Sequence, residues 1–111
     1  MKNSLKKNED FKKVFDSKAS FANKYLVLYV KENDLGSNRL GIQVSKKVGN
    51  SVVRHRLTRL IRESYRLNAD KFRVGLDLVF IAREGAKDKK YKEIEDALLH
   101  LGGISHILSE N

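Results

Sequence analysis

The chain has 111 residues, of which 41% are hydrophobic and 33% are charged, and these values fit one modest globular domain. Lys and Arg number 23 against 14 Asp and Glu, and the resulting formal net charge of +9 indicates an anionic partner. The absence of cysteine excludes disulfide scaffolds, thiolate zinc sites and cysteine nucleophiles. No apolar run approaches the roughly 20 residues that span a bilayer, and no targeting segment is visible, so we expect a soluble, cytoplasmic protein with no membrane partner.

The first half of the chain predicts one helix followed by strands. Apolar residues recur at mostly helical intervals over residues 4–17, and the serine that opens this range is the candidate N-cap. Residues 25–32 are rich in β-branched and aromatic side chains and predict a mostly buried strand, with a short extra strand at residues 21–22. A turn cluster at residues 33–38 leads into alternating apolar residues over 39–45, which predicts a β-hairpin.

A helix is predicted over residues 51–67, after Gly49 interrupts the strand pattern and with Asn50 or Ser51 as its cap. At 100° per residue one face is basic, and we expect the opposite arc to face the core. The basic face carries His55, Arg59, Arg62 and Arg66, and the core arc carries Val53, Leu57, Leu60, Ile61, Ser64 and Leu67.

The remaining segments complete the fold class. The near-continuous apolar run at residues 76–82 predicts a central strand covered on both faces. A last helix is expected from Lys89 onward, disturbed or ended near Gly102 and Gly103. The order is approximately αβββαβα, so we predict an α+β fold in which residues 1–111 form a single-domain two-layer α/β sandwich.

Positive charge is concentrated in one strand, turn and helix. Residues 39–66 hold eight basic side chains against one acidic one, Glu63, and so carry +7 of the net +9. Guanidinium groups bind phosphate oxygens bidentately and stack on unpaired bases, which favours nucleic acid over a membrane surface. The free amides of a helix N-terminus beside Gly49 would add to a phosphate site. The alternative is a solvated helix face, which usually interleaves acidic with basic side chains.

Aromatic side chains are the second requirement for recognising unpaired nucleotides, because bases stack on them. The candidates are Phe11, Phe15, Phe21, Tyr25 and Tyr29. From the spacing alone, Phe11 and Phe15 fit the core stripe of a helix equally well.

Catalytic signatures are scarce. The chain has no glycine-rich phosphate motif, no HExxH and no cysteine, and we predict neither a catalytic residue nor a metal site on the protein. His100 and His106 are six residues apart, which places them on different sides of a continuous helix. His55 lies between two arginines, so a protein-only nuclease that uses it as a general base is an open but unsupported alternative.

Residues 46–66, KKVGNSVVRHRLTRLIRESYR, resemble the signature region of the bacterial ribonuclease P protein subunit. NEDFKKVF, LVLYV, RLGIQVSKKVGNSVVRHRLTRLIRE and LDLVFIAR follow in the order of that family, so the resemblance covers nearly the whole chain. It implies a left-handed β-α-β crossover around the basic helix, against the usual right-handed preference.

The resemblance also implies a function and a partner. The protein would be the accessory, non-catalytic subunit of an endoribonuclease whose large catalytic RNA uses Mg²⁺ to remove the 5′ leader of precursor tRNA. It would bind the leader and stabilise the complex of catalytic RNA and substrate, with no need for protein oligomerisation.

Site residues are carried over by position. Phe11, Phe15 and Tyr29 resemble the cleft that meets the single-stranded leader. The residues that resemble the basic loop and helix in contact with catalytic RNA, together with their neighbours on that face, are Lys46, Lys47, Arg54, His55, Arg56, Arg59, Arg62 and Arg66. The chain departs from the family pattern at His55, where asparagine is usual, and at Thr58, where a basic residue is common.

Two further alternatives use the same charge pattern. A ribosomal or general RNA-binding protein would not discriminate precursor from mature tRNA. A DNA-reading helix-turn-helix fits less well, because the basic helix follows a strand and a glycine turn rather than another helix.

Overall fold

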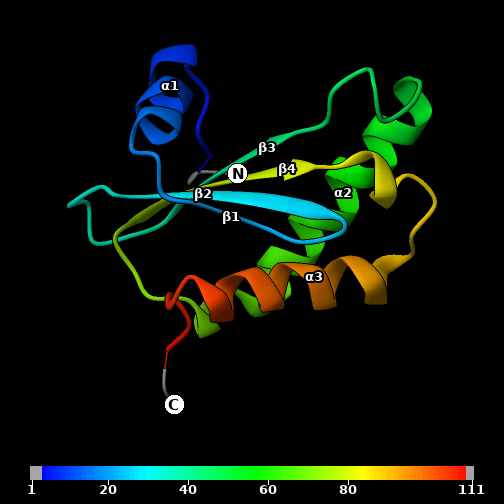
Figure 1. Ribbon diagram of the computed structural model, residues 1–111. Helices are drawn as coiled ribbons and strands as arrows, with labels where there is room; N and C mark the ends of the chain where they lie inside the picture. The colour runs from blue at the N-terminus through cyan, green and yellow to red at the C-terminus, as the bar shows by residue number, and fades with distance from the viewer. Residues whose placement is uncertain (1–3, 110–111) are drawn as a thin grey trace.

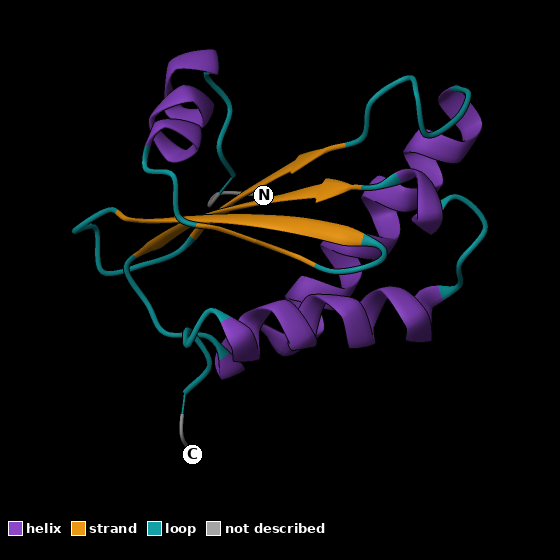
Figure 2. Ribbon diagram, viewed as in Figure 1, coloured by secondary structure: helices purple, strands orange, loops and turns teal. Residues whose placement is uncertain are grey.

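The computed structural model describes residues 4–109 and contains three helices and one four-stranded sheet (Figures 1 and 2). The predicted α+β class and the element order are confirmed. The elements are α1 (Asn8–Asp16), β1 (Ser20–Ala22), β2 (Leu26–Glu32), β3 (Arg39–Gln43), α2 (Ser51–Asn68), β4 (Leu76–Ala82) and α3 (Tyr91–Ile104), with 3₁₀ turns η1 (Ala69–Lys71) and η2 (Glu84–Ala86).

The predicted hairpin between β2 and β3 is wrong, because the strand order is β1-β2-β4-β3. β4 lies between them, antiparallel to β2 and parallel to β3. Five of its seven residues are buried in succession, so it is stable only inside the sheet with both faces covered. Because β4 lies between them, β2 and β3 are two inter-strand spacings apart, about 10 Å, and the connection over residues 33–38 spans this distance.

The parallel pair β3 and β4 is joined by α2, and the connection is left-handed. In Figure 1 both strands point to the same side, β4 lies in front of β3, and α2 passes below the sheet between them. This is the handedness that the family resemblance implied, and it is rare among β-α-β units.

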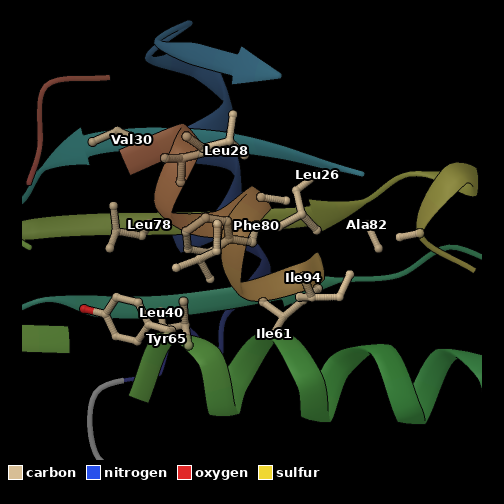
Figure 3. Packing of buried hydrophobic residues seen from close by; sticks show 14 of the residues in the cluster. Leu26, Leu28, Val30, Leu40, Ile61, Tyr65, Leu78, Phe80, Ala82 and Ile94 are labelled. Carbon is tan, nitrogen blue, oxygen red and sulfur yellow. The ribbon is translucent and has the colours of Figure 1, made fainter. Parts of the chain in front are cut away.

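Helices cover both faces of the sheet, but unequally. α2 and α3 pack side by side below it, and α1 lies alone above it (Figure 2). The larger core lies on the α2 and α3 side, where side chains of β2 and β4 such as Leu28 and Phe80 meet Ile61 and Ile94 (Figure 3). The smaller core joins α1 to the opposite face through Leu5, Val14 and Val79.

The buried arc of α2 differs from the arc that apolar residues alone predict. Leu67 is 54% exposed, and its neighbour Asn68 is buried instead. Asn68 Nδ2 donates to the Ser64 carbonyl oxygen (2.7 Å) and to Glu95 Oε2 (2.9 Å), so its burial leaves no polar group unpaired. The centre of the arc therefore passes through Asn68, and Leu67 lies 100° away from it.

Three predicted boundaries also shift. α1 begins at Asn8 rather than at Ser4, which forms an isolated parallel bridge with Leu40 and caps no helix. β3 ends at Gln43. α3 continues through both glycines to Ile104, and Gly102 fits closely there because a β-carbon would lie 2.8 Å from Leu108 Cδ2 and 3.1 Å from Phe72 Cε2.

Candidate nucleic-acid interface

The eight predicted RNA-contacting residues lie on the turn before α2 and along α2 itself, and we call them the basic surface. Lys46 and Lys47 are exposed in the turn, and Val48 anchors that turn in the core. On α2, His55, Arg59, Arg62 and Arg66 are exposed, whereas Arg54 and Arg56 are half-buried. The predicted separation of a polar, basic face from a buried face is thus confirmed.

The N-terminus of α2 is capped by Asn50, whose Oδ1 accepts from the Val53 amide (3.0 Å). The first turn of α2 contains no acidic residue, so nothing in it neutralises the positive end of the helix dipole. Gly49 serves internal packing, because a β-carbon there would lie 2.8 Å from Val53 Cβ. Packing against Val53 thus accounts for the glycine at this position, and no contact with a phosphate is needed to explain it.

The arginines of the basic surface fall into two groups. Arg56 donates to the carbonyl oxygens of Lys87 and Lys89, which fixes the segment before α3 against α2. Arg66 pairs with Glu63 one turn away. The guanidinium groups of Arg54, Arg59 and Arg62 make no hydrogen bond or ion pair with the other residues of the range 4–109. Arg54 is half-buried with its Nε enclosed, whereas Arg59 and Arg62 are exposed and available to a ligand.

Two grooves run beside this face of α2 and share Arg59 and Arg62. One, of about 310 Å³, has only polar neighbours: Ser51, Arg54, His55, Thr58, Arg59 and Arg62. The other, of about 550 Å³, lies between α2 and the start of α3 and is lined by Arg56, Arg59, Leu60, Arg62, Glu63 and Tyr91. Thr58 donates its hydroxyl to the Arg54 carbonyl (2.9 Å), so its side chain is tied to the helix backbone.

Arg39, the arginine of residues 39–66 that lies outside the basic surface, has a structural role. Its Nε and Nη2 donate to the two carboxylate oxygens of Asp77 at 2.9 and 2.8 Å, and Asn33 Nδ2 donates to the same carboxylate (2.8 Å). Burial raises the pKa of Asp77, but the hydrogen bonds from Arg39 and Asn33 and the charge of Arg39 outweigh it and hold the pKa below its ordinary value. The contacts tie β3 to β4.

The three predicted leader-binding aromatics form one cluster on the α1 side of the sheet, which we call the aromatic cluster. The Phe15 ring packs edge-on against Tyr29 with centroids 5.0 Å apart, and Phe11 lies 6.4 Å from Phe15. All three are half-buried, so each ring presents an accessible part. The other two aromatic candidates, Phe21 and Tyr25, pack against the larger core instead.

The aromatic cluster and the start of the basic surface lie on the same side of the sheet. In Figure 1, α1 rises above one end of the strands and the first turn of α2 rises above the other. Between them the sheet presents the outward residues of its strands, among them Val27, Gln43 and Ile81. A single extended strand of nucleic acid could therefore contact both surfaces.

The remaining titratable residues do not converge. Within residues 4–109, no three His, Asp or Glu side chains come together where they could hold a metal ion. His100 contacts Asn23 Nδ2 through Nδ1 (3.1 Å), and His106 is exposed beyond the end of α3. In the described part of the chain, every helix is too short or too polar to traverse a bilayer.

The fold and these surfaces define a class: a small, strongly basic α+β protein suited to binding a polyanion. A family model described as Ribonuclease P matches residues 1–104. The ribonuclease P protein component of Lachnoclostridium phytofermentans is 58% identical over 111 residues, which are 100% of this chain and 96% of the relative.

Solved structures agree. The RNase P protein of Staphylococcus aureus superposes with a TM-score of 0.88 at 35% identity and covers 96% of this chain and 98% of its own. That of Thermotoga maritima gives 0.82 at 30% identity, with coverage of 88% and 93%. The chain belongs to the bacterial ribonuclease P protein family. It is a protein subunit of the endoribonuclease ribonuclease P, with a role in tRNA processing and the ribonuclease P RNA as its partner.

Sequence reasoning missed Leu60 and Tyr91 as surface residues. The helical pattern predicts Leu60 in the core arc and Tyr91 in the apolar stripe of the last helix. Both are half-buried and line the larger groove. The only signal in the sequence is the position of Tyr91 directly after the run of lysines that ends the preceding loop.

Proposed function

We propose that this chain assists catalytic RNA in removing the 5′ leader of precursor tRNA by binding two RNA segments at once. The basic surface binds the catalytic RNA, and the aromatic cluster binds the single-stranded leader. The observation that carries this proposal is that the first turn of a cation-rich helix and an aromatic cluster lie above two ends of one sheet face.

The basic surface is suited to phosphates for a physical reason. A helix face that serves only solubility normally pairs its cations with acids, yet here only Arg66 has such a partner on the helix. Arg59 and Arg62 keep their donors free for RNA, and the capped N-terminus of α2 adds unpaired amides. The exposed imidazole of His55 is offered to the same RNA.

The aromatic cluster suits an unpaired leader. Bases of any sequence stack on aromatic rings, and a single strand leaves those bases accessible. The cluster is held by α1 on one side and by β2 on the other, so its rings are fixed before the RNA arrives. Less conformational freedom is then lost on binding.

The protein supplies no catalytic group in this proposal. Mg²⁺ is a cofactor of the catalytic RNA, and the protein lowers the repulsion between two polyanions by placing its cations between them. Precursor tRNA is the substrate of the assembled particle.

The test is Mg²⁺-dependent cleavage of 5′-labelled precursor tRNA by the protein alone, by a bacterial ribonuclease P RNA alone at limiting Mg²⁺, and by both together. We expect strong stimulation only with both, at the mature 5′ boundary. Cleavage by the protein alone would overturn the accessory role. Failure to stimulate a competent RNA would leave only a general RNA-binding function.

Leader binding is tested by Phe15→Leu, which keeps apolar packing but removes the ring. We expect the holoenzyme to bind precursor tRNA about 5- to 150-fold more weakly, the range expected for one base-stacking contact, and to bind mature tRNA with unchanged affinity. Phe21→Leu is the matched control, because Phe21 is also half-buried but packs against the larger core. Circular dichroism melts report whether either variant is damaged. If the holoenzyme with a folded Phe15→Leu protein bound precursor tRNA as tightly as the wild-type holoenzyme, the proposed leader site would be wrong.

A further inference from the structure

The larger groove beside α2 differs in chemistry from its neighbour. Leu60 and Tyr91 add one aliphatic and one aromatic side chain among three arginines, whereas every residue that lines the smaller groove has a polar or charged side chain. A phosphate requires only donors and positive charge, and an apolar floor would add nothing to its binding. A nucleobase requires both an apolar face to stack on and polar groups at its edge.

Tyr91 is held in position by a network that joins the two helices. Its hydroxyl donates to Glu95 Oε2 (2.9 Å), the same oxygen that accepts from the buried Asn68 of α2 (2.9 Å). Burial and the hydrogen bond to Glu95 raise the pKa of Tyr91, so the group stays a neutral phenol. Because the hydrogen bond to Glu95 holds the hydroxyl, the ring forms a rigid wall of the groove rather than a mobile surface side chain.

The other walls are equally defined. Arg56 fastens the segment before α3 through the carbonyl oxygens of Lys87 and Lys89, which sets the width of the groove at the tyrosine. Glu63 is ionised, because the hydrogen bond from Arg66 holds its pKa below the ordinary value. A carboxylate repels phosphate but accepts hydrogen bonds from the amino group of a base. Arg59 and Arg62, shared with the polar groove, are free to hold the phosphates on either side.

We propose that this groove binds one unpaired nucleotide of the catalytic RNA, with its base against Tyr91 and Leu60 and its phosphate on Arg59 and Arg62. The proposal rests on the proposed function, since it takes the basic surface as the contact with catalytic RNA. It adds a recognition element from α3, outside the basic helix. The groove volume of about 550 Å³ lies within the range of small-molecule sites.

The direct test uses mononucleotides. The protein is labelled at leucine methyl groups, and AMP or ribose 5-phosphate is added while the Leu60 methyl resonances are followed by NMR. Ring current from a stacked base shifts these methyls upfield, so we expect AMP to move them and ribose 5-phosphate, with the same phosphate, to leave them nearly unmoved. Equal responses to the two probes would show a phosphate site only and would overturn the proposal.

The test in the complex uses Tyr91→Leu. We expect about 5- to 150-fold weaker binding to ribonuclease P RNA, the range expected for one base-stacking contact. The dependence of affinity on salt should not change, because no phosphate contact is removed. Tyr91→Phe, which keeps the ring, should retain most of the affinity. Tyr25→Leu is the matched control, since Tyr25 also lies beside α3 but faces Glu93 and Asp96.

The two levels of the proposal fail differently. If Arg59→Gln with Arg62→Gln weakens binding and lowers the salt dependence while a folded Tyr91→Leu protein binds normally, the nucleotide site is wrong and the basic surface stands. If the arginine variant has no effect, the proposed function of the basic surface is itself wrong. Thermal melts of each variant exclude loss of fold as the cause.

Discussion

Asp77 shows how one buried charge organises the part of the sheet next to α1, since Nη1 of its partner Arg39 also lies 3.8 Å from Asp10 Oδ2 of that helix. Its carboxylate is 5% exposed and accepts from Arg39 and Asn33. Asp77→Asn would leave the half-buried guanidinium of Arg39 with only the more distant carboxylate of Asp10 (3.8 Å) as a counter-ion. We expect a loss of about 2–3 kcal/mol in the free energy of unfolding at pH 7, measured by urea denaturation.

The same residue gives a pH dependence with a definite sign. Because the pKa of Asp77 is lower in the folded protein than in the unfolded chain, its stabilisation is complete above the unfolded pKa and is lost as the pH falls through the folded one. The difference between the wild type and Asp77→Asn should therefore shrink below about pH 4. Asp16→Asn, in the exposed pair with Lys12, is the control and should cost little at any pH. A constant difference down to about pH 2, well below the ordinary aspartate pKa, would contradict this role.

At the scale of elements, α1 is positioned by a contact between an aromatic ring and a strand position that lacks a side chain. A β-carbon at Gly41 would lie 2.6 Å from Phe11 Cε1 and 3.2 Å from Leu5 Cδ1. Gly41→Ala should push Phe11 and with it α1 away from β3, at a cost of about 1–2 kcal/mol in the free energy of unfolding. Leader affinity should fall, while affinity for catalytic RNA, which involves α2, should not.

A double variant separates this steric effect from others. Phe11→Ala removes the obstructing ring, so Gly41→Ala should cost less in that background than in the wild type. Gly103→Ala, at a helical position where a β-carbon meets nothing within 4 Å, should be neutral or stabilising. Strictly additive costs of Gly41→Ala and Phe11→Ala would show that the ring is not what the new methyl group meets.

The elements that sequence predicts well are those whose pattern is local. The apolar run of β4 and the sided charge of α2 follow from the residues themselves. The hairpin prediction failed because β4, which follows a further helix in the chain, lies between β2 and β3 and pairs with both. The start of α1 differs from the prediction because Ser4 forms a parallel bridge with Leu40 of β3 and does not cap the helix.

The candidate site was predictable to the same degree. Exposure of Arg59 and Arg62 follows from helical geometry, and the gathering of Phe11, Phe15 and Tyr29 is consistent with the family resemblance. Periodicity gives no reason for that gathering, because Tyr29 comes from another element. The groove at Tyr91 required the packing of α2 on α3, which no local pattern encodes.

For the whole molecule, the distribution of charge matters more than its total. Residues 39–66 carry most of the net +9, yet Arg39 and Arg66 are paired with Asp77 and Glu63. Fewer basic residues are thus free to bind RNA than the sequence count suggests, and they centre on the turn before α2 and the middle of that helix. A field focused in this way orients the protein on a polyanion, whereas an even distribution would only attract it.

This distinction is testable with two variants of equal net charge. Arg59→Gln with Arg62→Gln removes two charges from the basic surface, and Lys24→Gln with Lys71→Gln removes two exposed charges outside it. Removing one phosphate-binding cation lowers the slope of log affinity against log salt by roughly 0.7–0.9, so the first variant should lower it by about 1.4–1.8 for catalytic RNA. The second should leave the slope nearly unchanged, because distant charges release no counterions at the interface with the RNA. Equal slopes for the two variants would mean that total charge, and not its placement on α2, governs assembly with the RNA.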